Sequence, residues 1–565
     1  MARRLSRLLP LLLATTFFPL GLGAQTVLPR TRPPEPTVPG ITVDDLMTRL
    51  YIFAADSMRG REAGTEGNVK GTDYLAAEAA RIGLEPAGED GTYFQTVPYK
   101  SRALAPESSI RVGGDALHLG DDFLPLGQGE TDLKGVTPIF GGSLAGDGAG
   151  LTLEEAQGKL VVFLGGDNIN LGALSRAAVP GAAAVAVVAL DQIPPPFREF
   201  FTRPQGFVDD PEREAAESAP VLLLSEDATQ RIFATPLDGL EAGAVGASVD
   251  LAIRYDVEPM PYPSRNVVAI LPGSDPELRG EYVAIGAHND HVGIEGEPVA
   301  HDSLRTFNRV VRPGGAEDGN RRATPAQQAE VNRLLAEYRA AHPGPVRMDS
   351  IANGADDDGS GSVTVLEIAE KLASMDPRPK RSILFVWHTG EEKGLLGAGY
   401  FTDHPTVPRE AIVAQINMDM VGRGSADDQT GHTVEGEAMY GNPDYLLLVG
   451  SRRISTELGD LVESVNREKG HGLDFDYSFD VENHPSNIYG RSDHYEYARY
   501  GIPIVFFTTG LHSDYHQVTD EPQYIDYDHM TRIARFVGDV ALEVADLDHR
   551  LVVDPPVTTG GAGGR

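Results

Sequence analysis

The chain contains no cysteine among its 565 residues. This absence excludes disulfides, thiolate metal sites, cysteine nucleophiles and lipid-modified cysteine anchors. Any zinc site would therefore have to be built from His, Asp and Glu side chains. Long apolar runs are also missing beyond the N-terminal region, so no later segment is expected to span a bilayer.

Basic residues are scarce relative to acidic ones. There are 48 Lys and Arg against 83 Asp and Glu, which gives a formal net charge of -35. Such an acidic surface would repel nucleic acids and anionic membranes, so we expect neither as a partner. The hydrophobic fraction of 41% and the charged fraction of 23% are ordinary for a soluble globular protein.

The N-terminus resembles a secretory signal peptide at residues 1–24. Arginines precede an apolar stretch at 8–22, and small residues follow it up to Ala24. The alternative is a transmembrane anchor, but the apolar stretch is short and is broken by Pro10 and Pro19, which favours cleavage. We therefore expect a soluble mature protein, secreted or periplasmic, with no membrane contact after cleavage.

Changes in composition divide the rest of the chain. Glycine and alanine rise between 103 and 255, where short apolar runs at 160–164, 183–190 and 221–224 predict strands. This stretch is interpreted as an inserted β-rich module, although it could instead be part of the main domain. The expected divisions are a disordered leader at 25–40, the N-terminal part of the main domain at 41–102, the module at 103–255, the main domain at 256–550 with an insertion at 293–348, and a flexible tail at 551–565.

In the main domain, apolar strands alternate with helices, which predicts an α/β fold. Two helical pieces are expected within 41–84. Strands are expected at 93–97, 266–271, 282–287, 383–387, 411–418 and 502–507, and helices at 365–372, 444–466 and 528–547. The insertion contains one clear helix, since Thr324, Pro325 and Gln327 form a capping box with proline at the first helical position. We expect this insertion to lie near the site, as a lid.

Candidate metal ligands follow the apolar strands or begin a helix: His288, Asp357, Glu392, Asp419 and His516. The carboxyl ends of the strands form one edge of an open α/β sheet, so these residues can converge there. Two histidines and three carboxylates suit zinc, and a bridging carboxylate would let them hold two ions about 3.5–4 Å apart. Taken singly, each residue could equally be an ordinary loop histidine, helix cap or buried acid.

Two adjacent carboxylates, Glu391 and Glu392, leave the strand at 383–387. Adjacent residues of an extended chain point in different directions. One carboxylate can therefore bind a metal while the other accepts a proton, which is the division of labour that metal-assisted hydrolysis requires.

The motifs that carry these residues resemble the M28 zinc peptidases, a family of two-zinc exopeptidases. The similar stretches are GAHNDHVG (286–293), NGADDDGSG (353–361), FVWHTGEEKGLLGAGYF (385–401), INMDMVG (416–422) and DYHQVTDEP (514–522). The resemblance implies a mixed central sheet flanked by helices and a protease-associated domain at 103–255. It also implies these roles: one zinc on His288 and Asp419, the other on Glu392 and His516, Asp357 as the bridge, Glu391 as general base, Asp290 orienting His288, and Tyr515 stabilising the oxyanion.

The expected function is hydrolysis of peptide substrates by an exported metallopeptidase, with an aminopeptidase as the leading hypothesis. A carboxypeptidase-like enzyme or another amide hydrolase of the family stays open, as does a non-catalytic binding protein on the same scaffold. The sequence leaves open the side-chain preference, the peptide end that is recognised and the oligomeric state. It assigns no role to 492–494. We expect His291, His388, His484 and His512 to contact the metal ligands from outside or to have structural roles.

Overall fold

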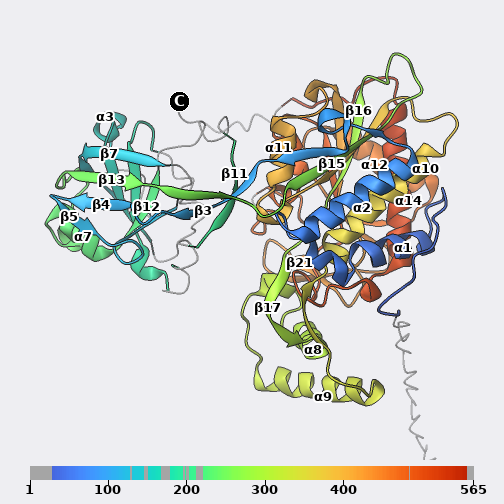
Figure 1. The fold of residues 1–565 in the computed structure, drawn as a ribbon, viewed down its shortest axis with the longest axis horizontal. Coiled ribbons are helices and arrows are strands. Elements are labelled where there is room, and N and C mark those ends of the chain that lie inside the picture. The colour runs from blue at the N-terminus through green and yellow to red at the C-terminus, as the bar shows by residue number, and fades with distance from the viewer. Residues whose placement is uncertain are drawn as a thin grey trace, which may run out of the picture.

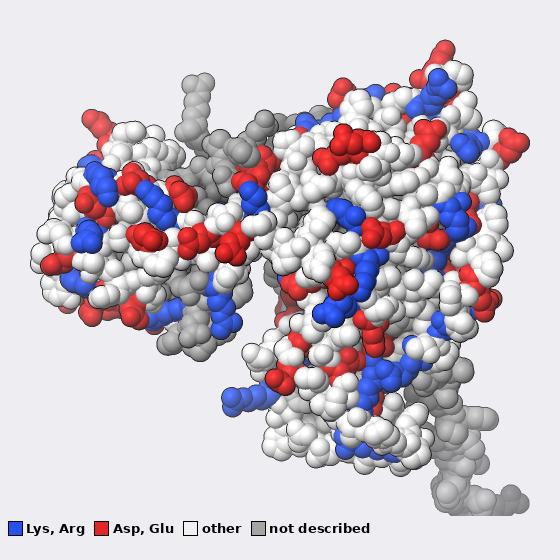
Figure 2. Space-filling model, viewed as in Figure 1, with Lys and Arg blue, Asp and Glu red and all other residues white. Residues whose placement is uncertain are grey.

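The computed structural model (Figure 1) describes residues 28–126, 130–144, 151–166, 179–194, 198, 203–210, 220–482 and 484–555. The predicted signal peptide and residues 556–565 of the predicted tail lie outside these ranges. No helix within them is both long and apolar enough to cross a membrane. On the face seen in Figure 2, acidic and basic side chains are interspersed.

A large mixed sheet forms the centre of the main domain and confirms the predicted α/β class. Its central strands run parallel in the order β19 (Ser382–His388), β16 (Tyr282–His288), β20 (Ile412–Met418) and β25 (Ile504–Thr508). The outer strands are β15 (Ser264–Leu271) and β23 (Tyr445–Val449), both antiparallel to their inner neighbours, then β1 (Glu85–Pro86), β2 (Phe94–Val97) and β24 (Asp474–Asp476). The central strands are apolar along most of their length because both faces of the sheet are covered.

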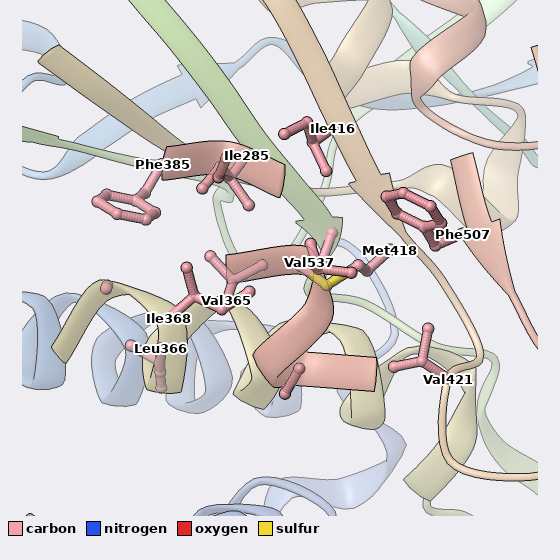
Figure 3. Packing of buried hydrophobic residues seen from close by; sticks show 14 of the residues in the cluster. Ile285, Val365, Leu366, Ile368, Phe385, Ile416, Met418, Val421, Phe507 and Val537 are labelled. Carbon is pink, nitrogen blue, oxygen red and sulfur yellow. The ribbon is translucent and has the colours of Figure 1, made fainter. Parts of the chain in front are cut away.

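Helices cover both faces of this sheet. One face carries α1 (Val43–Phe53), α2 (Glu66–Ile82), α10 (Gly361–Ala373), α12 (Thr456–Lys469) and α14 (Tyr527–Asp546). Figure 3 shows Ile285, Phe385 and Ile416 of the strands facing Ile368 of α10 and Val537 of α14. The alternate strand residues point to the other face, where they pack against α11 (Leu396–Asp403) and α13 (His494–Ala498).

The helix predicted at 444–466 is wrong in its first part. Residues 445–449 form β23, which pairs with β25, and α12 begins only at Thr456. The run Leu446-Leu447-Leu448 fits a strand or a helix equally well by periodicity. Its place beside β25 decides the outcome, because a strand there is buried on both faces.

The leader predicted to lack packed structure also differs. Its described part, 28–40, contains no helix or strand, but it lies against the main domain. The hydroxyl of Tyr51 donates to the Pro29 carbonyl, Arg32 pairs with Asp44, and Thr37 donates to Glu370. These side-chain contacts hold the segment in place without backbone periodicity.

The β-rich module occupies the left of Figure 1 and has its own core. One sheet contains β6 (Phe123–Pro125), β12 (Val221–Leu224), β10 (Ala184–Val188), β9 (Leu160–Leu164) and β8 (Pro138–Ser143); the facing sheet contains β5 (Asp115–Leu117), β4 (Ser109–Val112), β13 (Val249–Ile253) and β7 (Thr131–Val136). The chain enters through β3 (Tyr99–Leu104) and returns through β14 (Tyr255–Pro259), which pair antiparallel. Because the chain enters and leaves the module on adjacent strands, the module can be inserted into the main domain without separating the two ends that it joins.

The insertion at 293–348 forms a helical arm on a two-stranded base, below the main domain in Figure 1. Strands β17 (Gly293–Ala300) and β18 (Met348–Ala352) pair antiparallel and return the chain to the site. Between them lie α8 (His301–Val311), the short helix η5 (Gly315–Asp318) and α9 (Pro325–Ala341). The capping box predicted at Thr324 and Gln327 is present, whereas α8 was not predicted.

Candidate metal centre

The candidate residues reach one edge of the sheet, at the carboxyl ends of its parallel strands. His288 is the last residue of β16, Asp419 follows β20, and Glu391 and Glu392 form a turn after β19. Asp357 lies in the turn that leads into α10. Tyr515 and His516 come from the loop after β25.

A first group of ligands forms around His516. Its Nε2 lies 3.0 Å from Asp357 Oδ2 and 2.8 Å from Glu392 Oε2. His291 joins them, with its Nδ1 2.8 Å from Glu392 Oε1 and 3.8 Å from Asp357 Oδ2. One ligand atom from each of these four residues lies within 4.8 Å of the others.

A second group forms around His288. Its Nε2 lies 3.1 Å from Asp357 Oδ1 and 3.6 Å from Asp419 Oδ1. The two oxygens of Asp357 therefore face the two histidines on opposite sides. Asp358 lies close to this group too, but its oxygens accept backbone N–H groups of His288 and Gly361, at 3.0 and 2.8 Å.

These atoms fit zinc. Donor atoms around a tetrahedral ion with bonds of 2.0–2.1 Å lie about 3.3 Å apart, and the histidine–carboxylate pairs lie 2.8 to 3.6 Å apart. The fully buried Nε2 of His288 makes no hydrogen bond, although such an atom is normally satisfied. Imidazole and carboxylate ligands in this arrangement suit a divalent ion.

Burial and crowding of the acids perturb their titration. Burial raises the pKa of Glu391 well above its usual value; nearby Asp419 and Glu392 raise it further, and His288 opposes them. Burial lowers the pKa of His516, but Glu392 and Asp357 raise it by more, to about 10. These shifts show that the carboxyl and imidazole groups of the cluster are packed closely enough to perturb one another.

Glu391 stands apart from the ligand contacts. Its carboxylate lies 3.9 Å from Nε2 of His288. The carboxylates of Asp357, Glu392 and Asp419 lie closer, at 2.8 to 3.6 Å from Nε2 of His288 or His516. Its backbone N–H donates to Asp290 Oδ1 at 3.1 Å, which fixes the turn. Glu391 thus lies beside the candidate metal centre, and its carboxylate is not among the closest contacts of the two histidines.

Asp290 contacts His288 differently from the expected arrangement. Its backbone carbonyl lies 3.2 Å from Nδ1 of His288, whereas its carboxylate lies 3.7 Å away. Tyr515 stacks on His516, with ring centroids 3.9 Å apart, and its hydroxyl accepts a hydrogen bond from Arg491 Nη2 at 3.4 Å. Tyr515 therefore borders the metal centre.

Three residues that were not predicted as ligands also contact the candidate ligands. His291 lies beside Glu392; Ser492 donates to Asp419 Oδ2 at 2.8 Å; and Asp520 accepts the backbone N–H of Asp357 at 3.1 Å. Asp520 lies within the similar stretch 514–522, and Ser492 belongs to 492–494, to which the sequence assigns no role. No periodicity indicates either contact. His291 lies beyond the end of β16, where strand alternation no longer predicts direction.

The other three histidines make contacts outside the two groups. His388 Nε2 lies 3.0 Å from the Tyr497 hydroxyl, and His512 Nε2 lies 3.2 Å from Asp356 Oδ2. His484 Nδ1 accepts the backbone N–H of Ser486. These contacts agree with the structural roles expected for them.

A pocket of about 730 Å³, including its open mouth, adjoins the metal centre. Asp357, Glu391, Asp419 and His516 line it, and so do Glu317, Arg491 and Tyr515. Its apolar lining consists of Met420, Leu447, Phe479, Ile488, Phe506 and Leu511. An apolar side chain could therefore be buried within reach of the metal ligands.

Residues 266–541 match the sequence profile of peptidase family M28. This segment of the chain belongs to peptidase family M28. The matched segment contains every predicted ligand and Glu391, so the family assignment and the geometry concern the same part of the chain.

The chain is also similar in sequence to two fungal leucine aminopeptidases. Leucine aminopeptidase 1 of Neurospora crassa is 32% identical over 206 residues, which are 35% of this chain and 46% of the relative. Leucine aminopeptidase 1 of Trichophyton rubrum is 26% identical over 35% of this chain and 50% of its own length. The chain thus spans about half the length of these curated relatives.

Among solved structures, an aminopeptidase from Aneurinibacillus sp. strain AM-1 is similar over 91% of this chain and 96% of its own, with 16% identity and a TM-score of 0.44. A zinc aminopeptidase from Bacillus subtilis is similar over 90% and 96%, with 16% identity and a TM-score of 0.42.

Proposed function

We propose that this chain is a zinc-dependent aminopeptidase that holds two zinc ions and releases apolar N-terminal residues from peptides. The observation that carries the proposal is the placement of His288 and His516 on opposite oxygens of Asp357, with Glu391 beside them but outside the closest contacts. A bridging carboxylate flanked by two ligand sets and a nearby base suits hydrolysis by an activated water.

His288, Asp357 and Asp419 would hold one ion, and Asp357, Glu392 and His516 the other. Bound zinc would lower the pKa of a water molecule towards neutrality and polarise the scissile carbonyl. Glu391 takes the proton from the attacking water and returns it to the leaving amine. The Tyr515 hydroxyl donates a hydrogen bond to the developing oxyanion.

The pocket supports the choice of substrate. Its apolar lining would bury a side chain such as leucine next to the scissile bond. The relatives are leucine aminopeptidases, which agrees with an apolar residue at the N-terminus of the substrate. The alternative is a carboxypeptidase-like enzyme, and the substrate experiment below distinguishes it from an aminopeptidase.

We further propose that the module at 103–255 is a protease-associated domain and that the signal sequence exports the protein. The separate core of the module and its entry and exit on paired strands support the first proposal. Deleting the module and comparing kinetics on dipeptides and long peptides tests its part in substrate binding. N-terminal sequencing of the protein from culture medium and periplasm tests export and cleavage near Ala24.

The activity is tested by initial rates on leucyl arylamide with a free and with an N-acetylated amino group, before and after chelation and zinc addition. We expect hydrolysis of the free-amine substrate alone, its loss with chelator and its return with zinc. Hydrolysis of the acetylated substrate at a similar rate would refute the aminopeptidase assignment. A folded protein that binds no zinc would instead favour the non-catalytic binding protein.

A further inference from the structure

The helical arm at 293–348 contacts the loop that carries Tyr515 and His516 at several points. The backbone N–H of Ala316 donates to the Tyr515 carbonyl at 3.0 Å. Asn308 donates to Gln517 at 3.2 Å, and Gln517 in turn donates to the His516 carbonyl at 2.8 Å. The arm therefore supports the loop at Tyr515 and at Gln517, directly after His516.

Gly315 allows this close approach. It has a φ of +61°, and a Cβ atom there would lie 2.6 Å from the Tyr515 carbonyl oxygen and 2.9 Å from the Tyr515 nitrogen. No L-residue side chain fits at that distance without displacing the loop. The short helix η5 is thus seated directly on the backbone of Tyr515.

The arm also reaches the hydroxyl end of Tyr515, through Glu317 and Arg491. Both guanidinium Nη atoms of Arg491 contact the Glu317 carboxylate, at 3.0 and 3.2 Å. The Nη2 atom of Arg491 also donates to the Tyr515 hydroxyl at 3.4 Å. A two-point carboxylate–guanidinium pair fixes the orientation of the guanidinium plane more firmly than a single contact would.

We propose that Glu317 is a positioning residue of the active site: it orients Arg491, which holds the Tyr515 hydroxyl towards the substrate carbonyl. This inference rests on the proposed function, because it assigns Tyr515 the role of oxyanion donor. In this proposal the arm contributes to catalysis, because η5 contacts the Tyr515 backbone directly and the Tyr515 hydroxyl through Glu317 and Arg491. Glu317, Arg491 and Tyr515 all line the pocket, so the contact lies beside the proposed substrate site.

The test compares Glu317→Gln with Glu330→Gln, which removes an exposed carboxylate from α9 of the same arm. Glutamine keeps the size of Glu317 but loses the charge that orients Arg491. We expect kcat on leucyl arylamide to fall about 10-fold with KM changed less than about 2-fold, because an oxyanion donor acts mainly in the transition state. Zinc content, thermal midpoint and the rate of Glu330→Gln should match those of the wild type.

A second variant separates positioning from a general structural effect. In a Tyr515→Phe background the hydroxyl is absent, so Glu317→Gln should lower kcat by less than about 2-fold further. A wild-type kcat in Glu317→Gln would overturn the inference, and so would an equal loss in both backgrounds. Because the wild-type enzyme is assayed alongside, either result would leave the proposed peptidase activity standing.

Discussion

Replacing Glu391 by glutamine should separate metal binding from proton transfer. Glutamine has nearly the same shape, and the backbone N–H that donates to Asp290 is unchanged. The Glu391 carboxylate lies 3.9 Å from Nε2 of His288, whereas the paired carboxylates of Asp357 and Glu392 lie 2.8–3.1 Å from their histidines. Both zinc ions should therefore remain bound in the variant.

A general base contributes about 10²–10⁴ to the rate, which corresponds to about 3–5 kcal/mol of activation free energy. We expect kcat of Glu391→Gln on leucyl arylamide to fall by this factor, with KM within about 3-fold of wild type. The assay pairs initial rates with zinc content measured by mass spectrometry on the same dialysed sample. A variant with full zinc content and more than about a tenth of the wild-type kcat would show that another group takes the proton.

Three further predictions follow from the ligand shell, the pocket and the arm. His291→Ala should weaken zinc binding by about 10–100-fold, because His291 Nδ1 contacts Glu392; unchanged affinity in a chelator competition titration would exclude that role. Ile488→Ala should lower kcat/KM for leucyl relative to alanyl arylamide about 10-fold, since Ile488 lines the apolar pocket; an unchanged ratio would place the side-chain site elsewhere. Burial lowers the pKa of His301 to about 4, so between pH 6.5 and 4 the unfolded chain binds a proton that the folded chain does not. The free energy of unfolding should therefore decrease by up to about 3 kcal/mol as the pH is lowered from 6.5 to 4. Urea unfolding of wild type and His301→Phe at pH 7 and 4.5 measures this, and equal losses in both proteins would contradict it.

Much of the sheet and of the metal centre could be predicted from the sequence because both depend on local pattern. The apolar run that ends at Trp387 is a strand, and polar residues directly after such strands reach the same sheet edge. His288 and Asp419 were found in this way. The capping box at Thr324 was equally local, because all its members lie within one turn of helix.

The errors concern features that only tertiary contacts decide. Residues 446–448 fit a helix as well as a strand by periodicity. They form a strand because their backbone pairs with the edge of β25. The contact of Ser492 with Asp419 joins residues 73 positions apart, and no spacing rule connects them. The link from Glu317 through Arg491 to Tyr515 likewise spans three separate segments of the chain.

The most direct test of the two-zinc centre is the zinc content of the dialysed wild-type chain beside that of Asp419→Ala, with hydrolysis rates measured on both. Of the two histidines, Asp419 is paired with His288, whereas Asp357 faces both. The account predicts two zinc ions per wild-type chain, one in Asp419→Ala, and loss of most activity in the variant. A single zinc ion in a fully active wild type, or two in the variant, would contradict it.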